Sequence, residues 1–418
     1  GLISPLAAQA SDIMNLEEMS NYSRNSSSKV QRFDNKTFSN EISEDLAILK
    51  GRVDGLEAQQ NEFEAGAFSE TTTMDGKAIF TLGAMDYSLA SETKSEAAKA
   101  FYTYTMNLNT SFTGDDNLYV RIKTGNHSKT DFSYDKTYGS YLSSTNANGD
   151  ALKVDKIWYQ FPVGESNTVF VGPLIENYYM HGTTPSIYKP VLKAFTLGGN
   201  AAAYGASTDT GAGWVYKADN GFAISSNVGT KSKTTQKVGD SYVDSGLFTD
   251  QSKTSWATQI GLTKDQWAVS GMVNLKYNGW ADEYFSTAGG DDRPVSSTNY
   301  GLRAWWRPAD SGTATPQVSV GYDYSVLDGY DTNDTTDAFF VGLTWLDTFN
   351  ADDRLGVAFG QPQMRENTGA DPFMWEAYYG FKVNDSVTVT PTIFGASNAN
   401  GTDGEDYTGA VIETQFKF

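Results

Sequence analysis

The last twelve residues of the chain, from Tyr407 to Phe418, constrain the fold more than any other segment. Successive side chains of an extended strand point to opposite faces. One face then carries Ala410, Ile412, Thr414, Phe416 and Phe418, and the other carries Val411, Glu413, Gln415 and Lys417. A soluble sheet can alternate in the same way, but its chain rarely stops on a free Phe. The pattern therefore favours a strand of a membrane β-barrel.

Length and hydropathy fit such a barrel. A chain of 418 residues can form two or three soluble domains or one large closed barrel. No run approaches the roughly 18 consecutive apolar residues that a transmembrane helix needs. Aromatic residues at 13% and 40 glycines suit many twisted strands. The mean hydropathy of -0.44 is compatible with a barrel that has a polar lumen and polar loops.

Charge and residue usage disfavour several functions. The net charge of -20 argues against nucleic acid as a partner. Cysteine is absent, which excludes disulfides and thiol catalysis and is compatible with an oxidising envelope. His127 and His181 are the only histidines, neither has a zinc-site spacing, and no nucleophile motif is present. We therefore expect no enzyme activity and no cofactor.

The N-terminal residues 1–10 look like the remnant of a signal peptide. Ala8-Gln9-Ala10 satisfies the small-x-small cleavage rule after an apolar run, which predicts a mature start near Ser11. The alternative is an apolar terminus with no targeting role. Residues 11–41 are polar and carry too little apolar surface to fold alone, so we interpret them as a linker.

Residues 42–66 have the spacing of a coiled-coil helix. Apolar side chains recur at alternating steps of four and three. The predicted seam consists of Ile42, Leu46, Leu49, Val53, Leu56 and Phe63. A self-associating helix implies an oligomer, and mixed Ile and Leu on the seam leave its order open without favouring a strict dimer. The alternative is one amphipathic helix that packs against its own chain.

From residue 74 to residue 418, strand-length segments of period two are separated by clusters of Gly, Asp, Asn and Ser. In a membrane barrel, short turns and long loops alternate along the chain, because they lie at opposite ends. The count that alternates best predicts sixteen strands. Short turns are expected at 114–117, 164–167, 219–221, 265–266, 309–313, 350–353 and 384–386. Long loops are expected at 128–150, 176–210, 231–253, 281–297, 328–337 and 398–406.

The two faces of these segments differ in polarity. Apolar rows expected to face lipid include Trp267, Val269, Gly271, Val273, Leu275 and Tyr277, then Val318, Val320, Tyr322 and Tyr324, then Phe339, Val341, Leu343 and Trp345. Ser, Asn, Lys and Glu recur on the other face. A β-sandwich would fill its inner faces with apolar side chains. Sixteen strands closed in a ring instead enclose a water-filled lumen.

The loop from Glu176 to about Thr210 is rich in aromatic and basic residues for a solvated connection. Its candidate functional residues are Tyr178, Tyr179, His181, Tyr188, Lys189 and Lys193. Folded into the lumen, the loop would constrict the pore and select solutes by size. Left outside, it would cover the barrel or contact a neighbour. We favour the inward arrangement.

Alternation places further charged side chains on the lumen face: Arg121, Lys123, Lys276, Arg303, Arg307, Asp323, Glu376 and Lys382. Basic residues near a constriction favour anions, whereas the acidic chain as a whole argues for cations. The sequence leaves the ion preference open, and the alternative is a wall without selectivity. The acidic runs 328–334 and 403–406 could bind Ca²⁺ or Mg²⁺ through oxygen ligands, but they match no complete EF-hand, so solvated loops are the favoured interpretation.

Several segments resemble one family. LAILKGRVDGLEA at 46–58, GKAIFTLGA at 76–84, FTLGGNAAAYGAS from Phe195 and SWATQIGL from Ser255 are similar to cyanobacterial outer-membrane porins, a group related to carbohydrate-selective porins. Phe416 and Phe418 resemble the terminal signal by which outer-membrane barrels are recognised for assembly. Family members usually carry an S-layer homology domain before the coiled coil. Residues 11–41 lack that pattern, so tethering to peptidoglycan is not expected.

The resemblance implies a trimeric sixteen-stranded channel in the outer membrane that passes small solutes by passive diffusion. Inorganic ions, sugars and iron all stay open as solutes. The expected partners are small solutes, outer-membrane lipid and two further copies of the chain. The alternative function is a closed structural or receptor barrel that links the outer membrane to the periplasm.

Overall fold

The structure is a computed structural model. It describes residue 50 and residues 71–88, 97–128, 132, 140–204, 208–231, 236–238, 241–243, 247, 249, 252–278, 296–363 and 370–418. The chain divides into two units, residues 1–65 and 66–418, and all the described strands belong to the second. The predicted signal-peptide remnant, the linker and the coiled-coil seam lie outside the described residues.

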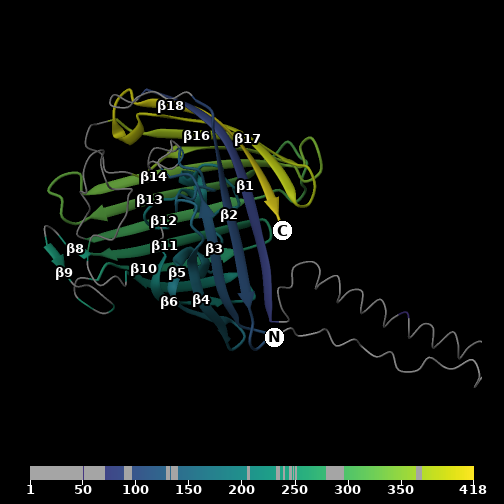
Figure 1. Cartoon of the computed structure of the whole chain (residues 1–418). Coiled ribbons are helices and arrows are strands. Elements are labelled where there is room, and N and C mark those ends of the chain that lie inside the picture. The colour runs from purple at the N-terminus through teal and green to yellow at the C-terminus, as the bar shows by residue number, and fades with distance from the viewer. Residues whose placement is uncertain are drawn as a thin grey trace, which may run out of the picture. The chain divides into compact units, whose positions relative to one another are not determined.

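Sixteen antiparallel strands form one closed barrel, as predicted (Figure 1). The strands are β1 (Thr72–Ser88), β2 (Lys99–Thr110), β3 (Asn117–Gly125), β4 (Lys153–Val163), β5 (Asn167–Glu176), β6 (Thr208–Lys217), β7 (Phe222–Thr230), β10 (Thr254–Thr263), β11 (Trp267–Tyr277), β12 (Ser296–Trp306), β13 (Gln317–Leu327), β14 (Thr335–Leu346), β15 (Arg354–Gln361), β16 (Phe373–Lys382), β17 (Val387–Ser397) and β18 (Asp406–Lys417). Each strand pairs with its neighbour in this order. Two short strands, β8 (Gln236–Val238) and β9 (Ser241–Val243), pair only with each other.

The last strand closes the barrel by pairing with both β17 and β1. Its terminal residue completes the ladder, because Gly76 and Phe418 exchange two backbone hydrogen bonds of 2.9 and 3.2 Å. The ring of Phe418 stacks on Tyr104 of β2 with centroids 5.7 Å apart. Because β18 alternates strictly, its apolar face meets lipid where the barrel closes between β18 and β1.

Turns of the predicted kind connect the strands at one end of the barrel. Gly114, Gly164 and Gly221 adopt positive φ there, a conformation that L side chains rarely take. Asp116 organises the turn between β2 and β3 by accepting hydrogen bonds from the backbone N–H groups of Phe112 and Thr113, each 2.8 Å long. Because long loops lie at the other end, the turn end is the periplasmic one.

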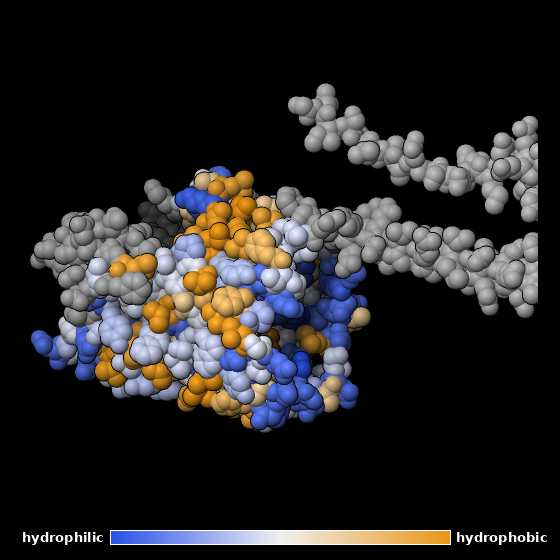
Figure 2. Space-filling model, turned by 90° about the horizontal axis from the view of Figure 1, so that it is seen from below, coloured by the Kyte–Doolittle hydropathy of each residue, from blue (hydrophilic) through white to orange (hydrophobic). Residues whose placement is uncertain are grey.

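The outer face of the wall is apolar, and its exposed side chains alternate with inward ones. In β11 every second residue from Trp267 is the more exposed one, and β13 repeats the pattern from Val318. Leu302 is 61% exposed and Phe80 55%, values expected of side chains that meet lipid. Figure 2 shows orange, apolar residues among pale ones along the wall, and blue, hydrophilic residues gathered toward its edges.

Helical structure in the described part of the barrel is limited to short 3₁₀ turns, namely η1 (Asn177–Met180), η2 (Lys193–Gly198) and η4 (Ala399–Gly401). None of the described helices is long and apolar enough to span a bilayer. Two of the 3₁₀ turns, η1 and η2, lie in the connection between β5 and β6.

Candidate pore constriction

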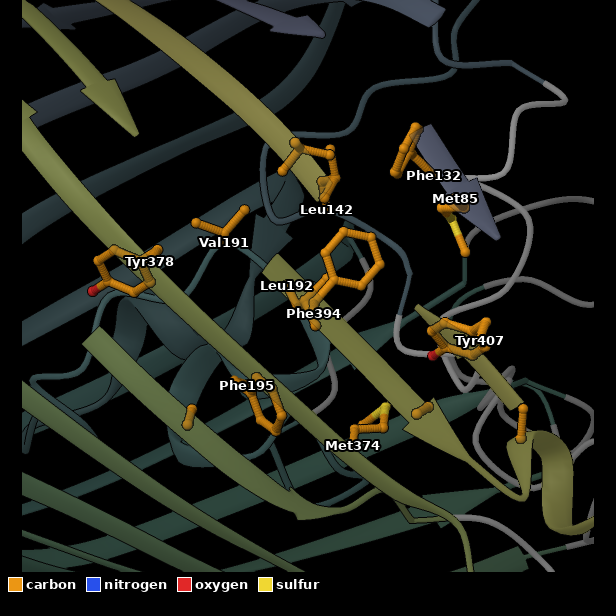
Figure 3. Close-up of a cluster of buried hydrophobic side chains, with 14 of the residues drawn as sticks. Met85, Phe132, Leu142, Val191, Leu192, Phe195, Met374, Tyr378, Phe394 and Tyr407 are labelled. Carbon is orange, nitrogen blue, oxygen red and sulfur yellow. The ribbon is translucent and has the colours of Figure 1, made fainter. Parts of the chain in front are cut away.

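The connection between β5 and β6 lies inside the barrel. It is described from Asn177 to Tyr204 and is named here the lumen loop. Leu192 and Phe195 of this loop are 0% and 2% exposed, although a solvated loop would leave them open to water. They pack against Phe340, Met374 and Phe394, inward residues of β14, β16 and β17 (Figure 3). An apolar patch on the inner wall thus holds the middle of the loop.

A carboxylate on the wall adds directed contacts to this apolar patch. Glu376 of β16 accepts hydrogen bonds from the Tyr188 hydroxyl at 2.8 Å and from the backbone N–H of Leu192 at 2.7 Å. The backbone N–H of Val191 donates to the same carboxylate at 3.3 Å. Three donors therefore satisfy a fully buried carboxyl group that the wall alone would leave unpaired.

A buried ion pair holds the second half of the lumen loop. Arg303 of β12 and Asp323 of β13 lie 2.8 Å apart, with side chains 0% and 2% exposed. Arg303 also donates to the carbonyls of Leu197 and Gly199 at 2.8 and 2.9 Å, and it stacks on the ring of Tyr204. The loop backbone thereby supplies the acceptors that a buried guanidinium requires.

Polar side chains of β10, β11 and β12 also bond the lumen loop to the wall. Gln259 of β10 makes a two-way amide pair with the backbone of Thr183, at 2.9 and 3.0 Å. Asn274 of β11 donates to the carbonyl of Ala203, and the indole of Trp305 donates to the carbonyl of Thr184. The lumen loop is consequently hydrogen-bonded to β10, β11, β12, β13 and β16.

Glycines of the wall make room for this close approach. A Cβ at Gly321 would lie 1.9 Å from the carbonyl oxygen of Gly198, and one at Gly261 would lie 2.3 Å from the Thr183 hydroxyl. A Cβ at Gly342 would lie 2.7 Å from the ring of Tyr188. Heavy atoms cannot approach so closely, so only glycine lets the loop lie flat at these three places.

A second connection, between β3 and β4, also enters the lumen, which the sequence reading did not anticipate. Leu142 forms an isolated antiparallel bridge with Leu192 of the lumen loop. The Ser144 hydroxyl donates to Glu413 of β18, and the Ser143 backbone N–H donates to the carbonyl of Val191. Two loops therefore share the interior. The signal available in the sequence was Leu142, an aliphatic residue inside a polar stretch.

The residues predicted to line the pore fall into three groups. Lys276, Arg303, Asp323 and Glu376 are buried on the inner face of the wall, Tyr188 is buried within the lumen loop, and all five bond within the protein. The alternation prediction is wrong for Arg307, which lies beyond the end of β12 in a turn and donates to the carbonyl of Asp265. Lys382 lies at the periplasmic rim and pairs with Asp352 and Asp385.

The third group lines the inner wall of β3 and β4 opposite the start of the lumen loop. Arg121 pairs with Asp155 while keeping 16% of its side chain exposed. Lys123 lies within electrostatic range of Arg121, Lys77 and Lys193. Lys156, which the sequence reading missed, pairs with Glu176 and lies near the same cations. Alternation along β4 could have identified Lys156, because it lies two residues before Trp158 and so on the same face of the strand.

Aromatic rings accompany these cations. Trp158 lies 4.4 Å from Tyr119 and 5.2 Å from Tyr179, between ring centroids, and Tyr178 stacks on Tyr179 at 4.9 Å. The ammonium of Lys156 lies 5.2 Å above the Tyr179 ring. Tyr179 is 42% exposed, so a ring edge faces solvent beside the charged groups.

His181 follows these tyrosines but carries no charge in the docked loop. Both ring nitrogens are shielded from solvent and have no hydrogen-bond partner among the described residues. Desolvation lowers the pKa of His181 to about 3. Its ring meets Tyr204 edge to face at 5.6 Å. His181 therefore contributes packing to the loop.

A closed sixteen-stranded barrel with a loop folded into its lumen defines the chain as a porin. The model of the carbohydrate-selective porin, OprB family matches residues 34–418, and the chain belongs to that family. The protein is accordingly an outer-membrane channel for passive diffusion of small hydrophilic solutes and not an enzyme.

Individual relatives are distant. The uncharacterized protein alr4550 of Nostoc sp. (strain PCC 7120) is 26% identical, over 90% of this chain and 71% of that protein. The high-pH structure of Pseudomonas putida OprB is similar with a TM-score of 0.58 and 11% identity, over 83% of this chain and 94% of that one. Salmonella typhi OmpF in complex with daunomycin is similar with a TM-score of 0.53 and 12% identity, over 83% of this chain and 97% of that one. At these identities the solved structures show a shared fold.

Proposed function

We propose that solutes cross the barrel between the lumen loop and the inner wall of β1 to β4, and that this passage favours anions and neutral sugars over cations. The single observation behind the proposal is the charge of that passage. Lys77, Arg121, Lys123, Lys156 and Lys193 lie within range of one another there. The carboxylates near them are Asp155 and Glu176, each held in an ion pair, and Glu413, which lies within range of Lys77.

Local charge outweighs the acidity of the chain because of distance. Charges farther than a Debye length of about 8 Å are screened at physiological salt. The acidic residues of the outer loops therefore act weakly on an ion at the constriction, whereas the basic side chains of the passage lie beside it. A lumen of low volume and low dielectric strengthens that effect.

The aromatic cluster supports passage of sugars through the same opening. A pyranose ring presents an apolar face to aromatic rings and hydroxyls to charged partners. The rings of Tyr178 and Tyr179 can contact the apolar face of the sugar. Arg121 and Asp155 offer hydrogen-bond donors and acceptors for its hydroxyls. Weak contacts of both kinds let a solute enter and leave, as a diffusion channel requires.

The test is the reversal potential of the purified protein in a planar bilayer under a potassium chloride gradient. We expect a potential of the sign that reports chloride preference, and Lys123→Glu should move it toward cation preference. Lys264→Glu is the matched control, because Lys264 lies exposed in the turn between β10 and β11 and donates to the carbonyl of Asn220. A cation-selective wild type would overturn the proposed preference.

We further propose that the protein is a homotrimer. The family resemblance and the apolar seam predicted at residues 42–63 support an oligomer whose barrels stand side by side. Single-channel recordings test it, since three linked pores open in multiples of three. Strictly single openings, together with a monomer mass in detergent, would contradict the trimer.

A further inference from the structure

A cavity of about 600 Å³ lies between the lumen loop and the turn end of the barrel. Inward residues of β1 and β15 to β18 line it on one side, and residues 143–144 and 189–191 of the two loops line it on the other. We name it the periplasmic vestibule. Its volume falls within the range of about 300 to 1,000 Å³ that small-molecule sites occupy.

The charges of the vestibule are unbalanced. It is lined by five basic residues, Lys77, Lys189, Arg354, Lys382 and Lys417, and by three acidic ones, Asp352, Asp385 and Glu413. Asp352 and Asp385 are both engaged by Lys382. Glu413 accepts a hydrogen bond from Ser144. Five positive and three negative charges leave a net charge of +2 on the vestibule wall.

Four of the cations form no contact ion pair in the described part of the chain, although Lys77 lies within electrostatic range of Glu413. Among the described residues, Lys77, Lys189, Arg354 and Lys417 form no ion pair, whereas Arg121, Lys156 and Arg303 elsewhere in the barrel each do. Lys189 lies within electrostatic range of the other three, and Lys77 within range of Lys417. Arg354, then desolvation, then Lys417 and Lys77 lower the pKa of Lys189. Like charges held together in this way destabilise the wall unless an anion joins them.

We propose that the periplasmic vestibule is a binding site for a small solute that carries a phosphate group. Arg354 offers a planar fork of donors that matches phosphate oxygens, and the three lysines surround it with positive charge. The hydroxyls of Thr388 and Thr390 line the same cavity and can bind a neutral sugar portion. The site rests on the proposed route through the barrel, and it lies beyond the constriction on that route.

The geometry also selects the source of the phosphate. The four unpaired cations lie on the lumen side of the barrel wall, so a lipid headgroup in the surrounding bilayer does not reach them. A phosphate covalently attached to a small soluble molecule does. Phosphate carries more negative charge than chloride and presents oxygens that match the guanidinium fork of Arg354, so we expect chloride to bind much more weakly.

The experiment measures block of the chloride current through the full-length protein by inorganic phosphate and by glucose 6-phosphate at constant ionic strength. Both should reduce the current, and glucose alone at the same concentration should reduce it less. We expect Arg354→Gln, and separately Lys189→Gln, to raise the half-blocking concentration by about tenfold. Lys264→Gln in a turn at the same end is the control and should leave the block unchanged.

The outcomes separate this site from the constriction. Block that is equal in wild type, Arg354→Gln and Lys189→Gln would overturn the vestibule site. If the reversal potential still reports chloride preference in that case, the proposed route survives. Heat-modifiable migration of each variant on a gel shows that its barrel is folded, so a lost block cannot come from misfolding. Block by sulfate at the same concentration, undiminished in the variants, would also count against the site.

Discussion

The hydroxyl of Tyr188 donates a 2.8 Å hydrogen bond to Glu376, which lies 188 residues further along the chain on the opposite wall of the barrel. Both side chains are buried, and the same carboxylate also binds two backbone N–H groups of the loop. One acidic side chain therefore fixes the position of the lumen loop at its midpoint. The loop behaves as part of the wall at this place.

Glu376→Ala should release the middle of the lumen loop and widen the pore. The substitution leaves the Tyr188 hydroxyl and the N–H groups of Leu192 and Val191 without an acceptor, each at a cost of about 1 to 3 kcal/mol. We expect a larger single-channel conductance with more current noise. Glu165→Ala, at an exposed turn position, is the control. Unchanged conductance of a folded Glu376→Ala barrel would show that the loop does not depend on this carboxylate.

Gly321→Ala should displace the loop by sterics alone. The new methyl group would lie 1.9 Å from the carbonyl oxygen of Gly198, so the loop backbone has to move. Gly271→Ala tests the same substitution on the lipid face, where the nearest atom, Leu302 Cδ2, lies 3.6 Å away. Trypsin cleavage after Lys193 measures the displacement, because Pro190 blocks cleavage after Lys189. We expect faster cleavage in Gly321→Ala than in Gly271→Ala, and equal rates would refute the close approach.

The Arg303–Asp323 pair predicts a non-additive pair of substitutions. Removing Arg303 alone leaves a buried carboxylate without its counter-ion, which costs about 3 to 5 kcal/mol. The single variant Arg303→Met should therefore destabilise the docked loop more than the double variant Arg303→Met/Asp323→Asn, although the double variant carries one more substitution. Urea unfolding followed by protease accessibility of the loop, in the wild type, Arg303→Met, Asp323→Asn and the double variant, gives the four free energies that a double-mutant cycle needs. Additive effects would mean that the two side chains do not stabilise each other.

Alternation was sufficient to predict the barrel from the sequence, because each side of a membrane strand meets one solvent. The rows from Trp267 and Val318 face outward as their pattern indicates, and the sixteen strands follow from the spacing of the turns. The interior of the barrel was harder to predict from the sequence. Alternation tells that Arg303 points inward, but it does not tell whether water or a loop covers it. The loop that does so bonds to residues more than a hundred positions away.

The vestibule could not be read from the sequence for the same reason. Its cations come from β1, β15, β16, β18 and the lumen loop, and each is unremarkable in its own segment. Lys77 and Lys417 meet only because the barrel closes between the first and last strands, where they are register partners. Closure is a property of the whole chain, so no local pattern predicts the cluster.

Low pH should loosen the lumen loop through His181. Burial lowers its pKa to about 3 in the docked loop, whereas the ordinary value is 6.5. The undocked loop therefore binds more protons between these two values. Docking is at full strength above pH 6.5 and weakens as pH falls toward 3, by about 2 kcal/mol at pH 5.

His181→Phe isolates this effect, because Phe keeps the edge-to-face contact with Tyr204 and cannot take a proton. Neither ring nitrogen of His181 has a hydrogen-bond partner among the described residues, so the substitution removes no such bond there. We expect wild-type conductance to rise between pH 7 and pH 4 and His181→Phe to respond less over that range. Other acidic groups of the lumen titrate equally in both proteins, so the difference between the two curves belongs to His181. Superimposable curves would assign the pH response, if present, to those other groups.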